Sequence, residues 1–430
     1  MKVFATNRIS ASSKPDARVI AFFGLYGAGN LGNDAALTSA RFAVQRHDPE
    51  AELVCVCFHP EVVRSEYGIN AVPIHMSGPL PDAPSGPRLL RMVQRPLFEL
   101  ARWVAVYRFL RRTDLVIVPG TGILDDFGER PHRMPYHLFR WSLSAKLART
   151  KFAFVNVGAG PIRHPVNRFL MKRAVRFSSY RSYRDDISRS YMSEIGASAD
   201  DTPVMPDLVF GVTRPAGPTL PGSSPTIGLG VMAYQGWAND PVSGEGIFRS
   251  YIDNMSTIAC RLLDKGYTVR VLIGETCDES AVDALLKSVR QRRDGDVPAG
   301  RLIAEPIDTM HDLLTQIAAT DAVIATRYHN VVGALMMNRP VVSLGYAARF
   351  DEIMKSMGLG DYCHHAESIV PEAILADLDE LLEKWDAFSP TVDNRNQQYL
   401  RELERQFESL IGPPVQPGVP AAILNGVGSR

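Results

Sequence analysis

The feature that most constrains this chain is the order of apolar run, glycine-rich turn, amphipathic helix and second apolar run near its start. Residues 18–23 (RVIAFF) contain a short run that is typical of a strand buried on both faces of a sheet. A turn with four glycines follows at 24–34, and we expect a helix over 35–47 and a second buried strand over 52–58. This order is that of a βαβ unit, so the sequence predicts an α/β protein with a parallel sheet.

Two more expected strands in this half of the chain also end in glycine turns. The strand at 114–118 leads into the turn 120–122, and the strand at 151–157 leads into the turn 158–160. Because the carboxyl ends of parallel strands gather at one edge, the three turns should line one cleft. Glycine lets backbone N–H groups approach an anion closely, although a tight turn without a ligand is the alternative for any single one. The first turn fits neither the dinucleotide fingerprint nor the P-loop, because it lacks Gly-Lys-Ser/Thr. The candidate binding residues on this side are Gly27, Gly29, Asn30, Gly122, Asp126, Gly158, Gly160 and Asp207.

The second half of the chain repeats the alternation and adds a polar turn at 326–329. The apolar run 322–325 leads into Thr-Arg-Tyr-His, and a helix and a strand beginning at 340 are expected after it. Arg327 is a fixed cation and His329 titrates near neutral pH, so this turn could hold an anion and move protons. A histidine that only caps or packs is the alternative, and Asn330 is the expected N-cap of the following helix.

The chain of 430 residues is long enough for two domains. A segment rich in Pro, Gly and Ser at 213–225 marks the boundary between them. We therefore expect two Rossmann-like α/β domains with a cleft between them. The expected divisions are an N-terminal extension (1–17), an N-terminal domain (18–212), the linker (213–225), a C-terminal domain (226–390), a C-terminal helix (391–411) and a disordered tail (412–430).

Charge and cysteine usage narrow the class of protein. Lys+Arg and Asp+Glu both number 47, so the net charge gives no support to nucleic-acid binding. The five cysteines form no zinc-binding set and suit a reducing compartment. No secretory signal is apparent, and no apolar run approaches the roughly 20 residues that span a bilayer. We expect a cytoplasmic protein without a metal.

Residues 87–113 have a character of their own. Seven arginines and one acid, Glu99, are interleaved with apolar and aromatic residues at helical spacing. A basic amphipathic helix of this kind suits an anionic membrane surface, which would make the protein peripheral on the inner face of the cell membrane. The alternative is a surface helix whose apolar stripe faces the core.

Several motifs follow one another along the chain: the three glycine turns, Tyr183-Arg184-Asp185 with Ser188, Pro206-Asp207, Arg327-x-His329, Pro340 and Tyr346. In their order and spacing, these motifs carry a resemblance to the polysaccharide pyruvyl transferase family, over about residues 18–360. Two positions depart from the usual pattern of that family: Asn33-Asp34 replaces Asp-Glu in the first turn, and Arg349 stands where lysine is often found.

The resemblance implies a fold similar to GT-B glycosyltransferases and transfer of pyruvate from phosphoenolpyruvate to two hydroxyls of a sugar, giving a ketal. The donor carries a carboxylate and a phosphate, which guanidinium groups hold best, so Arg184, Arg327 and Arg349 are the expected donor-binding residues. His329 is the expected proton shuttle, with Arg327 beside it in the catalytic turn. The N-terminal glycine turns, with Asp126 or Asp207, would hold a sugar or lipid-linked oligosaccharide. The reaction needs no cofactor.

Two other functions remain open from the sequence. A GT-B glycosyltransferase that uses a nucleotide sugar would place the diphosphate in the second domain, against Arg327 and Arg349. A non-catalytic glycan-binding protein with the same fold is the other.

Overall fold

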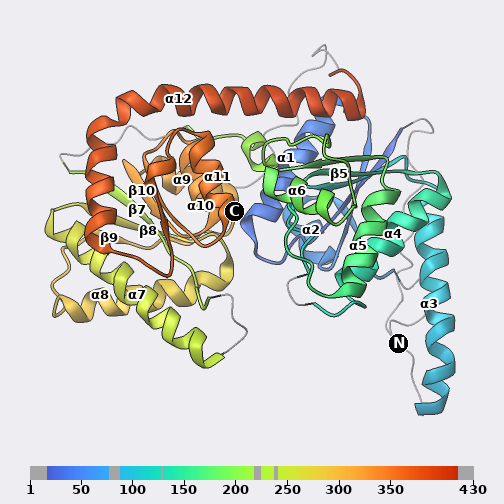
Figure 1. Ribbon diagram of the computed structural model, residues 1–430, viewed down its shortest axis with the longest axis horizontal. Helices are drawn as coiled ribbons and strands as arrows, with labels where there is room; N and C mark the ends of the chain where they lie inside the picture. The colour runs from blue at the N-terminus through green and yellow to red at the C-terminus, as the bar shows by residue number, and fades with distance from the viewer. Residues whose placement is uncertain (1–16, 77–87, 127–128, 217–223, 237–240, 415–430) are drawn as a thin grey trace.

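The computed structural model describes residues 17–76, 88–126, 129–216, 224–236 and 241–414. The predicted tail from 415 onward, the extension 1–16 and the centre of the predicted linker lie outside these residues. The chain forms two α/β domains, which lie side by side in Figure 1.

The N-terminal domain is built on a six-stranded parallel sheet in the order β3-β2-β1-β4-β5-β6. Its central strands are almost wholly buried, as their unbroken apolar sequence predicted. The strands are β1 (Val19–Phe23), β2 (Glu52–Cys57), β3 (Asn70–Pro73), β4 (Leu115–Pro119), β5 (Lys151–Val157) and β6 (Tyr180–Tyr183).

Helices cover both faces of this sheet. One face packs against α3, α4 and α5, which contribute Val106, Trp141 and Met171 to its buried core. The other face packs against α1 and the short 3-10 helix η1 (Leu208–Gly211). The helices of this domain are α1 (Leu31–His47), α2 (Pro60–Tyr67), α3 (Arg88–Leu110), α4 (Met134–Ala148), α5 (Pro165–Phe177) and α6 (Asp186–Glu194).

The C-terminal domain repeats the plan with a second parallel sheet, in the order β12-β11-β10-β7-β8-β9. Its strands are β7 (Thr226–Gly230), β8 (Thr268–Leu272), β9 (Leu302–Ile303), β10 (Ala322–Ala325), β11 (Val341–Gly345) and β12 (Cys363–His365). Its helical elements are α7 (Pro241–Asp264), η2 (Thr276–Asp278), α8 (Glu279–Arg292), α9 (Met310–Ala318), α10 (Tyr328–Met336), α11 (Ala348–Ser356), η3 (Gly360–Tyr362) and α12 (Pro371–Ile411). The two sheets confirm the predicted fold of two Rossmann-like domains.

The last helix, α12, belongs to both domains. It begins on the C-terminal domain, turns a corner and runs across to the N-terminal domain (Figure 1). Pro390 lies inside it and removes one backbone hydrogen bond, which is the usual cause of a sharp bend. Asn396 still donates to the Leu335 carbonyl of the C-terminal domain, at 2.8 Å, whereas Gln406 donates to Asn156 Oδ1 of the N-terminal domain, at 2.6 Å. The helix predicted to start at 391 is therefore the second half of a longer one.

The carboxyl ends of the two sheets meet. The first glycine turn, after β1, lies against the loop after β8: Thr276 N donates to the Gly29 carbonyl at 3.1 Å, and Leu31 N donates to the Gly274 carbonyl at 3.4 Å. The Asn30 side chain also donates to the Glu275 carboxylate. The strand ends that bind ligands in open α/β sheets thus face one another across the domain boundary.

Candidate active site between the two domains

A cavity of about 510 Å³ lies between the domains at these strand ends. The N-terminal domain lines it with the second and third glycine turns, the end of β6 and the start of α6. The C-terminal domain adds the turn between β11 and α11 and Gly236. The polar and glycine residues at its wall are Gly122, Asp125, Asp126, Gly158, Gly160, Arg163, Arg184, Asp185, Ser188, Gly236, Tyr346 and Arg349.

Arg184 follows the last residue of β6 and is almost completely buried, with 6% of its side chain exposed. Its Nη1 donates to Asp207 Oδ2 at 3.3 Å, while its Nε is buried without a hydrogen-bond partner. Burial is the largest single effect and acts to lower the pKa of Arg184, but Asp207, Tyr328 and Asp185 together raise it above its ordinary value, so the guanidinium keeps its charge. The fork lies directly on Gly158, where an added Cβ would come within 2.6 Å of Nη2. Glycine at this turn therefore makes room for the cation.

Arg349, in α11, enters the same cavity from the other domain. Its guanidinium lies 5.0 Å from the ring centroid of Tyr328 and 5.9 Å from that of Tyr346. Its Nε is buried and has no hydrogen-bond partner among the residues that the structure describes. The Arg184 guanidinium lies 5.6 Å from the same Tyr328 ring. One cation from each domain is thus gathered around one aromatic ring, with donors left over for an anion.

His329 lies behind this pair, in the first turn of α10. It packs directly on Gly32 of the N-terminal domain, because a Cβ at Gly32 would overlap the imidazole. Its Nε2 is buried without a hydrogen-bond partner, and the residue is not among those that line the cavity. Burial lowers the pKa of His329 well below its usual value, and the nearby arginines 184, 349 and 327 lower it further. The imidazole is therefore neutral at physiological pH in this state.

Arg327 does not line the cavity. Its Nε and Nη2 donate to the two oxygens of the buried Asp278 carboxylate, at 2.8 and 2.7 Å, and Nη2 also lies 3.0 Å from Glu275. Burial acts to lower the pKa of Arg327, and the two carboxylates raise it above the ordinary arginine value. Because Glu275 also accepts from Asn30, the Arg327 fork supports the contact between the domains.

The predicted N-cap of α10 was wrong. Arg327, not Asn330, occupies the N-cap position, and Asn330 is fully buried one turn into the helix with both polar side-chain atoms unpartnered. The N-cap therefore lies three residues earlier than the sequence predicted. The Asn330 amide lies instead against two glycines at strand ends, Gly230 and Gly274.

The predicted acceptor-side residues separate into two groups. Gly122, Gly158 and Gly160 line the cavity, whereas Gly29 and Asn30 contact the other domain and Gly27 lies in the same turn against Val62. This first turn is held by Asp34, which accepts from Gly27 N at 3.0 Å; burial raises the pKa of Asp34 to about 6.

The two predicted aspartates have partners of their own. Asp207 is buried, accepts from Val209 N at 3.0 Å and pairs with Arg184. Asp126 is at the cavity wall, but it is 2% exposed and accepts from His164 N at 2.9 Å. Its neighbour Asp125 is more accessible and sits over Gly160, where a Cβ would overlap its carboxylate.

Three residues of the site were not singled out from the sequence. Asp125, rather than the predicted Asp126, holds the more open position of the acidic pair. Arg163 comes three residues after Gly160, so its place in the third glycine turn was a usable signal. The position of the Tyr328 ring between two distant arginines had no local signal.

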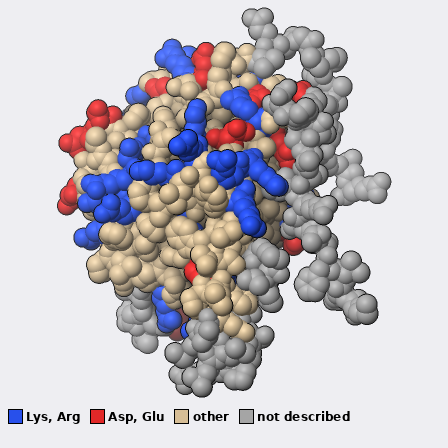
Figure 2. Space-filling view, turned by 90° about the vertical axis from the view of Figure 1, so that its right-hand side faces the viewer, with Lys and Arg blue, Asp and Glu red and all other residues tan. Residues whose placement is uncertain are grey.

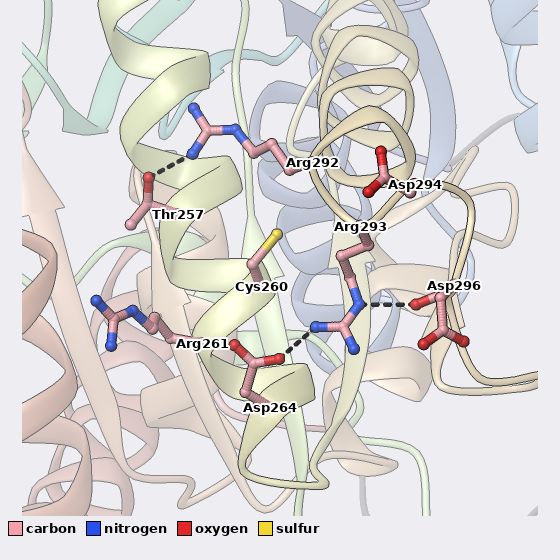
Figure 3. Close-up of a pocket in the computed structure, with 8 residues that line it drawn as sticks. All are labelled: Thr257, Cys260, Arg261, Asp264, Arg292, Arg293, Asp294 and Asp296. Atoms are coloured by element: carbon pink, nitrogen blue, oxygen red, sulfur yellow. Dashed lines mark hydrogen bonds and ion pairs between the residues drawn. The ribbon is translucent and has the colours of Figure 1, made fainter.

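A second hollow, of about 450 Å³, lies between α7 and α8 (Figure 3). Several of its charged groups are engaged with neighbours: Arg293 pairs with Asp264 and donates to the Asp296 carbonyl at 2.8 Å, and Arg292 donates to Thr257 at 2.8 Å. It lies on helices of the C-terminal domain away from the strand ends, so we assign the function to the cavity between the domains.

Metal ligation and membrane spanning find no support in the part of the chain that the structure describes. Among the described residues, no group of three or more His, Cys, Asp or Glu side chains is placed to hold a metal ion. Within the same part of the chain, no helix is long and apolar enough to cross a membrane.

The fold and the cavity between its domains define a two-domain protein of the GT-B type. UDP-GlcNAc 2-epimerase from Neisseria meningitidis bound to UDP-GlcNAc has a similar fold, with a TM-score of 0.57 at 11% identity over 91% of this chain and 98% of that one. A glycosyltransferase from Rickettsia africae ESF-5 gives a TM-score of 0.55 at 10% identity, over 92% and 99% of the two chains. At these identities the likeness concerns the fold alone. A search of curated proteins finds no match.

The sequence itself matches the polysaccharide pyruvyl transferase family over residues 30–348, and the chain belongs to that family. The match spans both domains and every residue of the cavity wall except Arg349. The predicted family is confirmed, and with it a transferase that acts on a saccharide in polysaccharide biosynthesis.

Proposed function

We propose that this protein transfers the pyruvyl group of phosphoenolpyruvate to two hydroxyls of a sugar, giving a ketal and inorganic phosphate. The observation that carries the proposal is the pair Arg184 and Arg349, one from each domain, at the wall of one cavity. Each has a buried Nε without a hydrogen-bond partner in the described structure. A small anion with a carboxylate and a phosphate would satisfy both forks at once. Arg184 is already paired with Asp207 and lies 3.6 Å from Asp185, so its unpartnered donors, together with those of Arg349, are what a neutral sugar would fill less well than an anion.

In the proposed reaction, the methylene carbon of the donor gains a proton and becomes the methyl group. The central carbon then forms two C–O bonds to the acceptor hydroxyls, and the bond to the phosphate oxygen breaks. The two hydroxyl protons balance the equation, one for the methyl group and one for the departing phosphate. No oxidant, reductant or other cofactor is needed. We propose that the glycine turns and Asp125 face the sugar, with Asp126 and Asp207 supporting the wall behind it.

His329 fits the role of a proton shuttle that donor binding switches on. Burial lowers its pKa most, and the three arginines around it lower it further. A bound anion would offset the charge of Arg184 and Arg349, which would raise the pKa of His329 toward the range where it can hold a proton. Arg327 then acts by position, since its fork fixes the turn that carries His329.

A nucleotide-sugar donor fits the contacts less well. That alternative requires Arg327 to bind a diphosphate, but two carboxylates already occupy its guanidinium. A diphosphate placed there would lie close to Asp278 and Glu275, and like charges at short range are unfavourable.

We further propose that the reaction takes place in the cytoplasm on a soluble or lipid-linked glycan, with contact to the inner face of the membrane through residues 87–113. Support for the compartment comes from the cysteines, all five of which are free. Nothing in the charge balance favours a nucleic acid as partner.

The test is incubation of the purified protein with phosphoenolpyruvate and a panel of glycans, followed by mass detection of a pyruvyl adduct and by phosphate release. Parallel reactions contain nucleotide sugars in place of phosphoenolpyruvate. Thermal stabilisation by each donor supplies an independent reading of binding. Adducts and stabilisation with nucleotide sugars alone would overturn the proposal, and glycan binding without turnover of either donor would identify a non-catalytic protein.

A further inference from the structure

Three helices of the N-terminal domain, α3, α4 and α5, form one continuous outer layer over the sheet. Aromatic contacts connect them: the ring of Trp103 on α3 lies 6.4 Å from that of Phe139 on α4, which lies 6.1 Å from that of Phe177 on α5. Lys146 Nζ of α4 is 4.9 Å from the Phe177 ring. We call this surface the three-helix face.

The three-helix face exposes large apolar side chains. On α3, Leu97 and Leu100 are each 61% exposed, and they share one stripe of the helix with the exposed Val104 and Tyr107. Leu147 at the end of α4 is 63% exposed. In α5, Phe169 is 54% exposed, with Arg173 stacked 5.3 Å from its ring. Most large apolar side chains that the described structure exposes are on this layer, and such a concentration marks an interaction surface.

The same face is strongly basic. Besides the buried Arg140, the segments 95–112, 134–149 and 165–177 together contain eleven Lys and Arg residues and one acid, although the whole chain is balanced at 47 and 47. The one acid, Glu99, is engaged within the layer by Arg140 at 2.9 Å and Tyr136 at 2.8 Å. Figure 2 shows the blue side chains gathered in a band across this side of the molecule, with uncharged residues between them.

The face adjoins the site. Arg163 lines the cavity between the domains, and α5 begins two residues later at Pro165. The exposed Val166 and Phe169 are thus in the first turns of a helix that starts at the rim of the cavity.

We infer that the three-helix face docks on an anionic phospholipid bilayer and sets the mouth of the cavity at the lipid surface. Cations surrounding exposed aromatic and aliphatic side chains match the charge and the interface of such a bilayer. The docking surface extends the contact expected for 87–113 to two further helices. The inference rests on the proposed function only in the purpose that it gives to docking, which is to bring a lipid-linked acceptor to the cavity. The docking itself requires no turnover.

The experiment is flotation of the full chain with vesicles of phosphatidylcholine alone and of phosphatidylcholine with one quarter phosphatidylglycerol. We expect binding to the anionic vesicles only, decreasing as salt rises. Two variants divide the face: Arg108→Gln with Arg111→Gln at the end of α3 and just after it, and Phe169→Ser with Arg173→Gln on α5. Each should weaken binding by roughly tenfold or more, because each removes cationic attraction and the second also removes an apolar contact. The matched control is Lys287→Gln with Arg290→Gln, two exposed cations of α8 in the other domain, which should bind as the parent does.

Circular dichroism and the Tm of each variant separate loss of docking from loss of fold. A Leu100→Glu variant serves as a second probe of α3 if the arginine pair unfolds the chain. An equal loss of vesicle binding in the α8 control would overturn the inference, because it would show that binding depends on the net charge of the protein and not on this face. Loss in the α3 variant alone would overturn the extension to α5. If the protein does not bind vesicles and Leu100→Glu instead converts a dimer of the protein to monomers, the face is an interface between two copies and the inference is wrong. Since flotation requires neither donor nor acceptor, its failure is distinct from a failure of pyruvyl transfer.

Discussion

Replacing Gly158 by alanine should displace the cation that we assign to the donor. A Cβ at this position would lie 2.6, 2.7 and 2.8 Å from Nη2, Nε and Cζ of Arg184. Ordinary contacts between such atoms are about 3.5 Å or longer, so the guanidinium must move by about 1 Å. The backbone of Gly158 is not in the left-handed region, so alanine itself is tolerated there. Overpacking of this kind costs about 1–3 kcal/mol of folding free energy.

The expected result is a loss of kcat/KM for phosphoenolpyruvate of roughly tenfold to a hundredfold, as expected for a misplacement of about 1 Å at a reacting centre. Phosphate release measures the activity, and urea denaturation measures the stability. The matched control is Gly246→Ala in α7, where an added Cβ meets nothing within 4 Å. That change should raise the free energy of unfolding by about 0.5–1 kcal/mol and leave activity unchanged, because it only removes a helical glycine.

A double variant separates the two effects. Gly158→Ala with Arg184→Lys removes the bulk of the fork, so stability should recover while affinity for the donor does not, since an ammonium cannot replace two parallel donors. Wild-type activity and stability in Gly158→Ala would refute the close packing of the turn on Arg184. A double variant that regains full activity would refute the assignment of the fork to the donor.

Three other substitutions test single contacts. Arg349→Gln should raise KM for phosphoenolpyruvate by roughly ten- to a hundredfold, the equivalent of about 1.5–3 kcal/mol for a charged hydrogen bond. The Tm should barely change, because Arg349 has no ion-pair partner in the described structure. An unchanged KM with a lower Tm would assign the residue to packing. Asp34→Asn should stabilise the protein above pH 6 and not below pH 4, as measured by urea denaturation across pH. Burial raises the folded pKa of Asp34 from 3.8 to about 6, so the native state binds the proton more tightly and loses up to about 3 kcal/mol as pH rises through this window; a variant with the parent's pH slope contradicts this. Arg327→Gln should cost about 3–5 kcal/mol in the same assay, because it leaves the fully buried Asp278 carboxylate without its cation, and a loss below 1 kcal/mol would show that the pair is dispensable.

The sequence predicted the parts of the site that depend on strand ends. The apolar run before Gly24, the glycines at 120–122 and 158–160 and the position of Arg184 after a strand all follow from local composition. Parallel topology then brings the turns of each domain to the carboxyl edge of its sheet. A cavity between the domains follows when these two edges face each other. The two-sheet fold was predictable for the same reason.

The partners of the charged residues were not predictable. Arg327 and Asp278 are 49 positions apart, and nothing in the sequence indicates that the Asp278 carboxylate accepts hydrogen bonds from the Arg327 guanidinium. The pair of Arg184 with Asp207 depends likewise on how β6 and η1 are placed in three dimensions. Asn330 was misassigned because its amide suited an N-cap, whereas the depth of α10 in the core decides its position.

The bend of α12 has a mechanical consequence. The polypeptide passes between the domains twice, once in the segment leading to β7 and once along α12 between Asn396 and Gln406. Because α12 is a continuous helix over this second crossing, it connects the two domains more firmly than a single linker would. The corner at Pro390 lies on the C-terminal-domain side of that crossing, since Asn338 donates to Ser389 before the corner and Asn396 donates to the Leu335 carbonyl after it. The bend therefore fits the helix to the C-terminal domain, and the stretch beyond it helps to set how Arg184 and Arg349 face each other across the cavity.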